Sequence, residues 1–285
     1  MVLHLEKKHK NVFLFDIKAK SRKEDFWFLL QADHHWDSLK CDRELMEHHL
    51  KQAQERNAPV LMFGDFFDCM GGKYDPRSNK EDIRPEFQNK NYFDSIVNGA
   101  NEWLKPYAEN IKFISKGNHE MSIVKHQETD LIERLTTLLN YNGAECHPAG
   151  YTGWIVFRTE VDNKRSTIKM NFTHGSGGGG PVTKGVIQSN RRAASIDADI
   201  YVAGHIHENW MLEVPREILS HVSLKPQLKV CTHLQIPSYK EEYLCGEGWA
   251  RERGMPPKPK GAWWLRIFWS YRHNKHIYEV MKAEE

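Results

Sequence analysis

The chain has 285 residues, enough for one large α/β domain or two smaller ones. Its hydrophobic fraction of 40% and charged fraction of 27% are typical of globular proteins and exclude a disordered, collagenous or low-complexity chain. Lys and Arg number 40 against 38 Asp and Glu, a net charge of +2, so any nucleic-acid site has to be local rather than a property of the whole surface.

The sequence shows neither a membrane-spanning run nor a secretory signal, and these two features predict the cellular compartment. Its apolar runs are far shorter than the roughly 20 residues that span a bilayer, and the first ten residues place charge where a secretory signal would be apolar. Five cysteines without a CxxC pair favour neither a disulfide framework nor a cysteine zinc site. We therefore expect a cytoplasmic protein with no membrane partner, and its oligomeric state stays open.

Short apolar runs at residues 26–30, 60–63, 111–115 and 199–203 predict buried strands, and each run stops at a polar cluster. Between the runs, apolar residues recur at three- and four-residue spacings, as in residues 46–53 and 131–139, which predicts helices. This alternation is typical of βαβ units with a parallel sheet. In such sheets the functional crevice lies beyond the carboxyl ends of the strands, which is where the polar clusters fall.

The second half of the chain has a different pattern. Residues 151–161 and 166–174 are extended runs joined by residues 162–165, a hairpin signature. The GSGGGG run at 175–180 is either an interdomain linker or, as we favour, a tight loop that lets the backbone approach a ligand. We expect one domain over 1–285, with its motifs in 33–207 and with completing strands and a basic, Trp-rich segment in 208–285.

The polar clusters point to metal chemistry when they are taken as a set. A lone Asp after a strand is usually a cap or turn residue, and a lone His is usually structural. Together the clusters offer carboxylates, imidazoles and an amide, the donors that hold Mn, Fe, Zn or Ni, and they could fill two metal sites. The five clusters are Asp33-His34-His35, Gly64-Asp65-Phe66-Phe67-Asp68, Gly117-Asn118-His119-Glu120, His174-Gly175 and Gly204-His205-Ile206-His207.

Spacing within the clusters supports two adjacent ions. On an extended segment, Asp33 and His35 can point the same way, as can His205 and His207. A carboxylate that bridges two cations explains an Asp at position 65, after a glycine that lets the backbone turn sharply. Such bridging is typical of two-metal hydrolytic sites, whose ions lie roughly 3.5–4 Å apart.

The motifs D-x-H, G-D-x-x-D, G-N-H-E, H and G-H-x-H occur in this order over residues 33–207, and this set resembles the calcineurin-like metallophosphoesterase superfamily. The resemblance implies a four-layered αββα sandwich, in which two mixed β-sheets are flanked by helices and the metal site lies at the strand carboxyl ends. It implies one metal held by Asp33, His35 and His207. It implies a second held by Asn118, His174 and His205, with Asp65 bridging both and His119 as proton donor.

The implied chemistry is phosphate ester hydrolysis. Two divalent ions, Mn first and Fe, Zn, Ni or Mg as alternatives, would give a bridging hydroxide at neutral pH and neutralise the phosphoryl oxygens. His119 would protonate the leaving group as general acid. We expect Asp68 and Glu120 to hydrogen-bond ligand histidines or the loop backbone and so orient them.

Departures from neighbouring families narrow the substrate. The superfamily's protein phosphatases have Arg-Gly after G-D-x-x-D and Arg before G-N-H-E, whereas this chain has Cys69-Met70 and Lys116, so a protein phosphatase is disfavoured. The GDFFD motif with an aromatic helix around residues 92–103 looks more like the DNA repair exonuclease branch. That branch usually has Asp where Glu120 stands, and its second domain is not recognisable after residue 207.

We expect a phosphodiesterase with nuclease activity on DNA or RNA. The alternatives are a cyclic-nucleotide or other small-molecule phosphoesterase, and a non-catalytic binding or scaffold protein.

The carboxyl-terminal segment is locally basic and aromatic. Residues 249–275 hold seven basic residues and one acid, a combination that suits single-stranded nucleic acid. Arg266 and Arg272 are candidate phosphate contacts there, and Arg191 and Arg192 are alternatives after the glycine run. The competing interpretation is that alternating residues 263–271 form sheet core, which leaves the arginines on a solvated outer face.

Overall fold

A computed structural model gives the fold and describes residues 2–71, 80–180, 182–220, 223–241, 243, 254 and 256–284. Two of the seven basic residues counted in 249–275, Arg251 and Arg253, lie outside these residues. Across the described residues, no helix combines the length and apolar character that a membrane span requires.

One sheet has seven strands in the order β1-β2-β7-β8-β9-β11-β10. Its strands are β1 (Val2–His9), β2 (Val12–Lys18), β7 (Thr152–Val161), β8 (Lys164–Thr173), β9 (Ile200–Ala203), β10 (Trp210–Leu219) and β11 (Pro226–Gln235). Three antiparallel hairpins, β1–β2, β7–β8 and β10–β11, are joined through parallel pairs of β2 with β7 and of β9 with both β8 and β11. The sheet is therefore mixed.

The other sheet has six strands in the order β13-β12-β3-β4-β5-β6. Its strands are β3 (Phe26–Gln31), β4 (Val60–Phe63), β5 (Ile111–Ser115), β6 (His147–Ala149), β12 (Trp263–Ser270) and β13 (Lys275–Lys282). Strands β3 to β6 run parallel, and β12 lies antiparallel to β3. This sheet thus carries three of the five motif-bearing strand ends on one edge.

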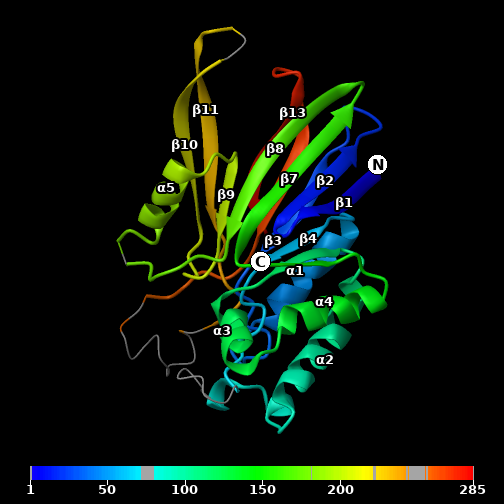
Figure 1. Ribbon diagram of the computed structural model, residues 1–285, viewed down its shortest axis with the longest axis vertical. Coiled ribbons are helices and arrows are strands. Elements are labelled where there is room, and N and C mark those ends of the chain that lie inside the picture. The colour runs from blue at the N-terminus through cyan, green and yellow to red at the C-terminus, as the bar shows by residue number, and fades with distance from the viewer. Residues whose placement is uncertain are drawn as a thin grey trace.

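Helices cover the outer faces of the sheets (Figure 1). They are α1 (Arg43–Glu55), α2 (Tyr92–Leu104), α3 (Asn118–Gln127), α4 (Leu131–Tyr141) and α5 (Val186–Ser195), with short 3₁₀ helices η1 (Lys80–Asp82), η2 (Pro85–Phe87) and η3 (Lys105–Tyr107). Residues of α1, α2 and α4 form one apolar cluster with the outer face of the six-stranded sheet. Helix α5 lies on the other side, against a small cluster around Tyr201 of β9.

Alternation along the strands builds the two main cores. In β3, Phe28 and Leu30 point into the cluster between the sheets, whereas Leu29 points into the cluster under the helices. Phe15 of β2 and Phe157 of β7 meet Phe28 from the facing sheet. A strand buried on both faces reads as a continuous apolar run, which is why these strands are visible in the sequence. The predicted αββα sandwich of two mixed sheets is confirmed.

The predicted elements appear close to their expected positions. All four apolar runs are strands, and α1 buries Met46, His49, Leu50 and Ala53, the residues whose spacing predicted it. The β7–β8 hairpin forms with a two-residue turn, shorter than predicted, at Asp162 and Asn163 with φ of 49° and 59°. Two positive φ angles in the turn match the twist of an antiparallel pair.

Candidate metal centre

The five motifs converge because each follows the carboxyl end of a strand. Asp33, Asp65 and Asn118 come after the parallel strands β3, β4 and β5 of one sheet. His174 follows β8, and His205 follows β9 of the other sheet, where β8 and β9 are also parallel. The site therefore lies where neighbouring edges of the two facing sheets meet.

One group of donors consists of Asp33, His35 and His207, whose ligand atoms all lie within 4.8 Å of one another. The Nε2 atoms of His35 and His207 are 3.3 Å apart, and His207 Nε2 is 3.4 Å from Asp33 Oδ1. This is the set that the superfamily resemblance assigns to the first metal.

A second group adjoins the first. Asp65, His174 and His205 also hold ligand atoms within 4.8 Å of one another. Asn118 Oδ1 lies 3.1 Å from His174 Nε2 and 2.7 Å from His205 Nδ1, and Asp65 Oδ2 is 3.1 Å from His174 Nε2. His174 Nε2 is also 3.8 Å from Asp33 Oδ1, which joins the two groups. All seven residues predicted as ligands are thus brought together.

The donor set fits divalent cations. Asp33 Oδ1 is buried, and although His207 Nε2 lies 3.4 Å away, no hydrogen bond of acceptable geometry reaches this oxygen from the described residues. An N···N separation of 3.3 Å between His35 and His207 agrees with two imidazoles sharing one tetrahedral ion, for which Zn–N distances of about 2.0–2.1 Å give about 3.4 Å. Carboxylate, imidazole and amide donors match Mn, Fe, Zn or Ni.

Most of the candidate ligands have an unusual backbone. Asp33, His35, Asp65, His205 and His207 have φ of 52°, 49°, 47°, 74° and 53°. The expectation that these segments are extended is therefore wrong. Asp33 and His35 do meet in one donor group, whereas His205 and His207 belong to different groups. Left-handed conformations are uncommon in residues other than glycine and persist where the surrounding structure holds them, often at functional sites.

Two motif glycines are required by close approach. A Cβ at Gly117 would overlap the Asp65 carboxylate and backbone, and one at Gly64 would overlap the His174 ring. Gly64 also has a φ of 85°. The glycines that precede Asp65 and Asn118 therefore let the strand ends and the ligands pack together.

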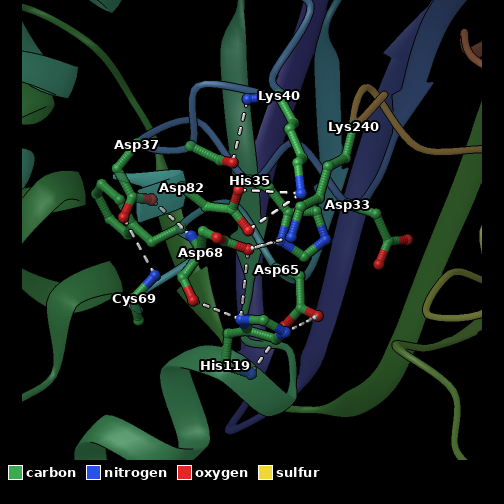
Figure 2. A network of polar contacts seen from close by, with 12 residues as sticks. Asp33, His35, Asp37, Lys40, Asp65, Asp68, Cys69, Asp82, His119 and Lys240 are labelled. Carbon is green, nitrogen blue, oxygen red and sulfur yellow. Dashed lines mark hydrogen bonds and ion pairs between the residues drawn. The ribbon is translucent and has the colours of Figure 1, made fainter. Parts of the chain in front are cut away.

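Asp68 lies among three cationic or imidazole side chains (Figure 2). Its Oδ1 accepts from His35 Nδ1 at 2.7 Å and from Lys240 Nζ at 2.9 Å. Its backbone carbonyl accepts from His119 Nδ1. Because Asp68 holds both rings through their Nδ1 atoms, the Nε2 atom of His35 faces the other candidate ligands and the ring of His119 is fixed in orientation.

His119 is positioned between Asp68 and Asp65. Its backbone N donates to Asp65 Oδ1 at 2.9 Å, and its Nε2 lies 3.7 Å from Asp65 Oδ2. Because Nδ1 is the donor to the Asp68 carbonyl, Nε2 is the ring nitrogen that faces the donor groups. This is the placement that a proton donor to a leaving group needs.

Glu120 organises the loops that carry the ligands. Its buried carboxylate accepts from the backbone N–H groups of Asp65, Phe67 and Gly117 at 3.2, 2.9 and 2.8 Å. Burial and Asp65 raise the pKa of Glu120 to about 8, against the hydrogen bonds from Phe67 and Gly117. These contacts to loop backbone are those expected of a residue that orients the loop.

Electrostatics differ between the two groups. Burial and the neighbouring Lys240 lower the pKa of His35 to about 4, so its ring is neutral at pH 7, the form that binds metals. Burial would lower the pKa of His174, but Asp65 and Asp33 raise it to about 10. Burial would raise the pKa of Asp65, but His174 and His119 hold it well below its usual range. Asp65 and Asp33 thus favour the protonated form of His174.

Two site residues were missed by the sequence analysis. Lys240 approaches from the segment after β11, and its neighbours Tyr239 and Ser238 both donate to the backbone carbonyl of Asp33. Asp37 is buried and accepts from the backbone N of Asp68 and of Cys69 and from the Tyr92 hydroxyl. Neither residue belongs to a motif, and Lys240 lies 172 residues from its partner Asp68, so no local pattern indicated them.

The four candidate substrate arginines lie outside the cavity of the metal donors, although Arg192 lines a neighbouring cavity together with Gly175 and Gly204. Arg191 is exposed on α5, and the neighbouring Arg192 binds Asn171 and the carbonyl of Val202. Arg266 pairs with Asp25 and Glu279, opposite Trp27 near the start of β3, whereas the site lies beyond the end of β3. Arg272 is in the turn between β12 and β13, at that same far end of the sheet.

The competing interpretation of the carboxyl-terminal strand is confirmed for four residues. Trp263, Leu265, Ile267 and Trp269 are buried, while Tyr271 is 70% exposed in the turn. None of the four candidate arginines lines the cavity that holds the metal donors.

Comparison with known proteins gives matches among solved structures only. No family model and no curated protein matches the chain. Vps29 from Entamoeba histolytica, complexed with Zn²⁺, is 12% identical over 90% of this chain and 99% of its own, with a TM-score of 0.37. A metallophosphoesterase from Sphaerobacter thermophilus is 11% identical over 91% and 89%, with a TM-score of 0.38. GAP50, the anchor in the inner membrane complex of Plasmodium, is 10% identical over 92% and 90%, with a TM-score of 0.41.

All three TM-scores are below 0.5.

Proposed function

We propose that the protein is a two-metal phosphate ester hydrolase. The observation that carries this proposal is the convergence of seven oxygen and nitrogen donors into two adjoining groups, with His119 Nε2 turned toward them. Asp33, His35 and His207 would hold one ion, Asn118, His174 and His205 the other, and Asp65 would be shared. When bound, two divalent ions lower the pKa of a bound water toward 7 and neutralise phosphoryl charge.

The chain's own residues supply orientation and a proton. Asp68 holds His35 by its carboxylate and His119 by its carbonyl, so both rings keep their Nε2 atoms toward the site. Hydrolysis breaks one P–O bond, and the departing alkoxide needs a proton that His119 Nε2 can donate. The oxygen of a water molecule forms the new P–O bond and replaces the leaving group, so no Ser or Cys nucleophile is needed.

The finer proposal is a phosphodiesterase that cleaves DNA or RNA, with Mn²⁺ as its metal. It is supported by two lysines, Lys240 and Lys258, that line the cavity of the donor groups, whereas none of the four candidate arginines lines it. The placement of His119 argues against the non-catalytic alternative, because a scaffold has no need of a proton donor beside the metal ligands.

A substrate panel tests the proposal. The metal-free protein, reconstituted separately with Mn²⁺, Fe²⁺, Zn²⁺, Ni²⁺ and Mg²⁺, should be assayed on a phosphomonoester, a small aryl diester, cyclic nucleotides, and single- and double-stranded DNA and RNA. We expect metal-dependent hydrolysis that is highest with Mn²⁺ and includes a nucleic acid. Hydrolysis of none of these esters with any metal would contradict the proposed function, and hydrolysis confined to cyclic nucleotides or monoesters would contradict the nuclease.

A further inference from the structure

Two lysines from the segment between β11 and β12 line the cavity of the metal centre. This cavity has a volume of about 270 Å³, and its walls include five of the candidate ligands, His119 and the glycine loop at 177–179. Lys240 and Lys258 are the Lys or Arg side chains on its walls among the described residues. Among the described residues, these two lysines are therefore the Lys or Arg side chains that a substrate would meet on the cavity wall.

Lys240 is fixed at the metal donors. Its Nζ contacts Asp68 Oδ1, the same atom that accepts from His35. The segment is held there by hydrogen bonds from Ser238 and Tyr239 to the carbonyl of Asp33. Its charge therefore lies beside the position of the reacting phosphate.

Lys258 is held on the wall of the same cavity by a different carboxylate. Its Nζ pairs with Glu208 Oε1, and Glu208 is a buried carboxylate directly after His207. Lys184 Nζ lies 3.8 Å from the other oxygen of Glu208, so this group of three carries a net charge of +1. The Lys258 side chain is 12% exposed, whereas that of Lys184 is 55% exposed and does not line the cavity.

The two anchors suggest two phosphate positions. An ammonium has three N–H donors, and the ion pair with Glu208 engages one of them. A substrate with one phosphate would be bound at the two metal-donor groups and beside Lys240. A second phosphate on the same chain would give Lys258 a charge partner.

We propose that Lys258 forms a subsite for a phosphate next to the scissile one, so that the substrate class is a linear oligonucleotide rather than a cyclic nucleotide or an isolated diester. This rests on the proposed function, because the scissile phosphate is placed by the metal donors. Lys258 is then a residue that determines specificity, while the ions and His119 carry the reaction.

The test compares the dinucleotide TpT with pTpTp, which has a phosphate on each end. We expect the Mn²⁺-loaded protein to have a kcat/KM about tenfold higher for pTpTp, the value of one hydrogen bond to a charged group. Lys258→Gln should lose this preference and Lys258→Arg should keep it. The matched control Lys51→Gln, which changes an exposed lysine paired with Glu47 on α1, should keep it too. An equal preference in the protein and Lys258→Gln, or an equal loss in Lys51→Gln, would overturn the subsite.

Binding supplies a readout that is independent of turnover. Calorimetric titration should show thymidine 3′,5′-bisphosphate binding about tenfold more tightly than thymidine 5′-monophosphate, with the difference absent in Lys258→Gln and restored in Lys258→Arg. Equal affinities for both ligands in the unmodified protein would overturn the subsite even if activity is seen. Absence of hydrolysis on every ester would instead count against the proposed function, and the binding difference would still decide the role of Lys258.

Discussion

An Asp65→Asn protein should bind both metals more weakly and hydrolyse phosphate esters more slowly. We expect its metal content to fall below the two equivalents of the unmodified protein, and its rate to drop on the order of 10³-fold, because loss of a bridging charge removes several kcal/mol of transition-state stabilisation. The amide has the same shape as the carboxylate but a single acceptor oxygen and no charge. Metal analysis after dialysis, together with hydrolysis of an aryl diester, measures both effects.

Asp82→Asn is the matched control for this substitution. Asp82 is an aspartate paired with Lys40, outside both donor groups, and its removal should leave metal content and rate unchanged. An Asp65→Asn protein with two equivalents of metal and full rate would show that Asp65 is not shared between the ions.

His119→Ala should separate the reaction from metal binding. We expect it to keep two equivalents of metal and to lose about 10²- to 10⁴-fold in rate on esters with alkyl leaving groups, the range for a missing general acid. Aryl leaving groups depart without a proton, so their hydrolysis should lose much less. The ratio of the two losses is therefore the signature of proton donation.

The control for His119→Ala is His126→Ala, which changes an exposed histidine on the same helix, α3. It should alter neither substrate. If His119→Ala slowed alkyl and aryl esters equally, His119 would have a positioning role, and the proton would have to come from elsewhere.

The sequence predicted the elements whose local pattern matches their environment. Strands β3, β4 and β5 are buried on both faces and therefore appear as apolar runs, and α1 has one buried stripe at helical spacing. The β1–β2 and β10–β11 hairpins were not predicted. β10 alternates between partly and fully exposed residues, and β11 pairs with β9 only over residues 232–235, so much of that hairpin carries no strong apolar signal.

The sequence predicted the candidate metal ligands but not the residues that hydrogen-bond to them and to their loops. The ligand types and their order along the chain indicated the donor groups, because parallel strands bring their carboxyl ends to one edge. Lys240 and Asp37 act through long-range contacts that leave no local pattern. Arg266 shows the converse: its basic surroundings in sequence suggested a phosphate contact, but its carboxylate partner Asp25 lies 241 residues away.

The location of two bound ions is the most direct test of a two-metal centre. Crystals grown with Mn²⁺ should show two anomalous peaks: one contacted by Asp33, His35 and His207, the other by Asn118, His174 and His205, with Asp65 touching both. A single peak, or peaks away from these residues, would contradict the two-metal site and the function proposed for it.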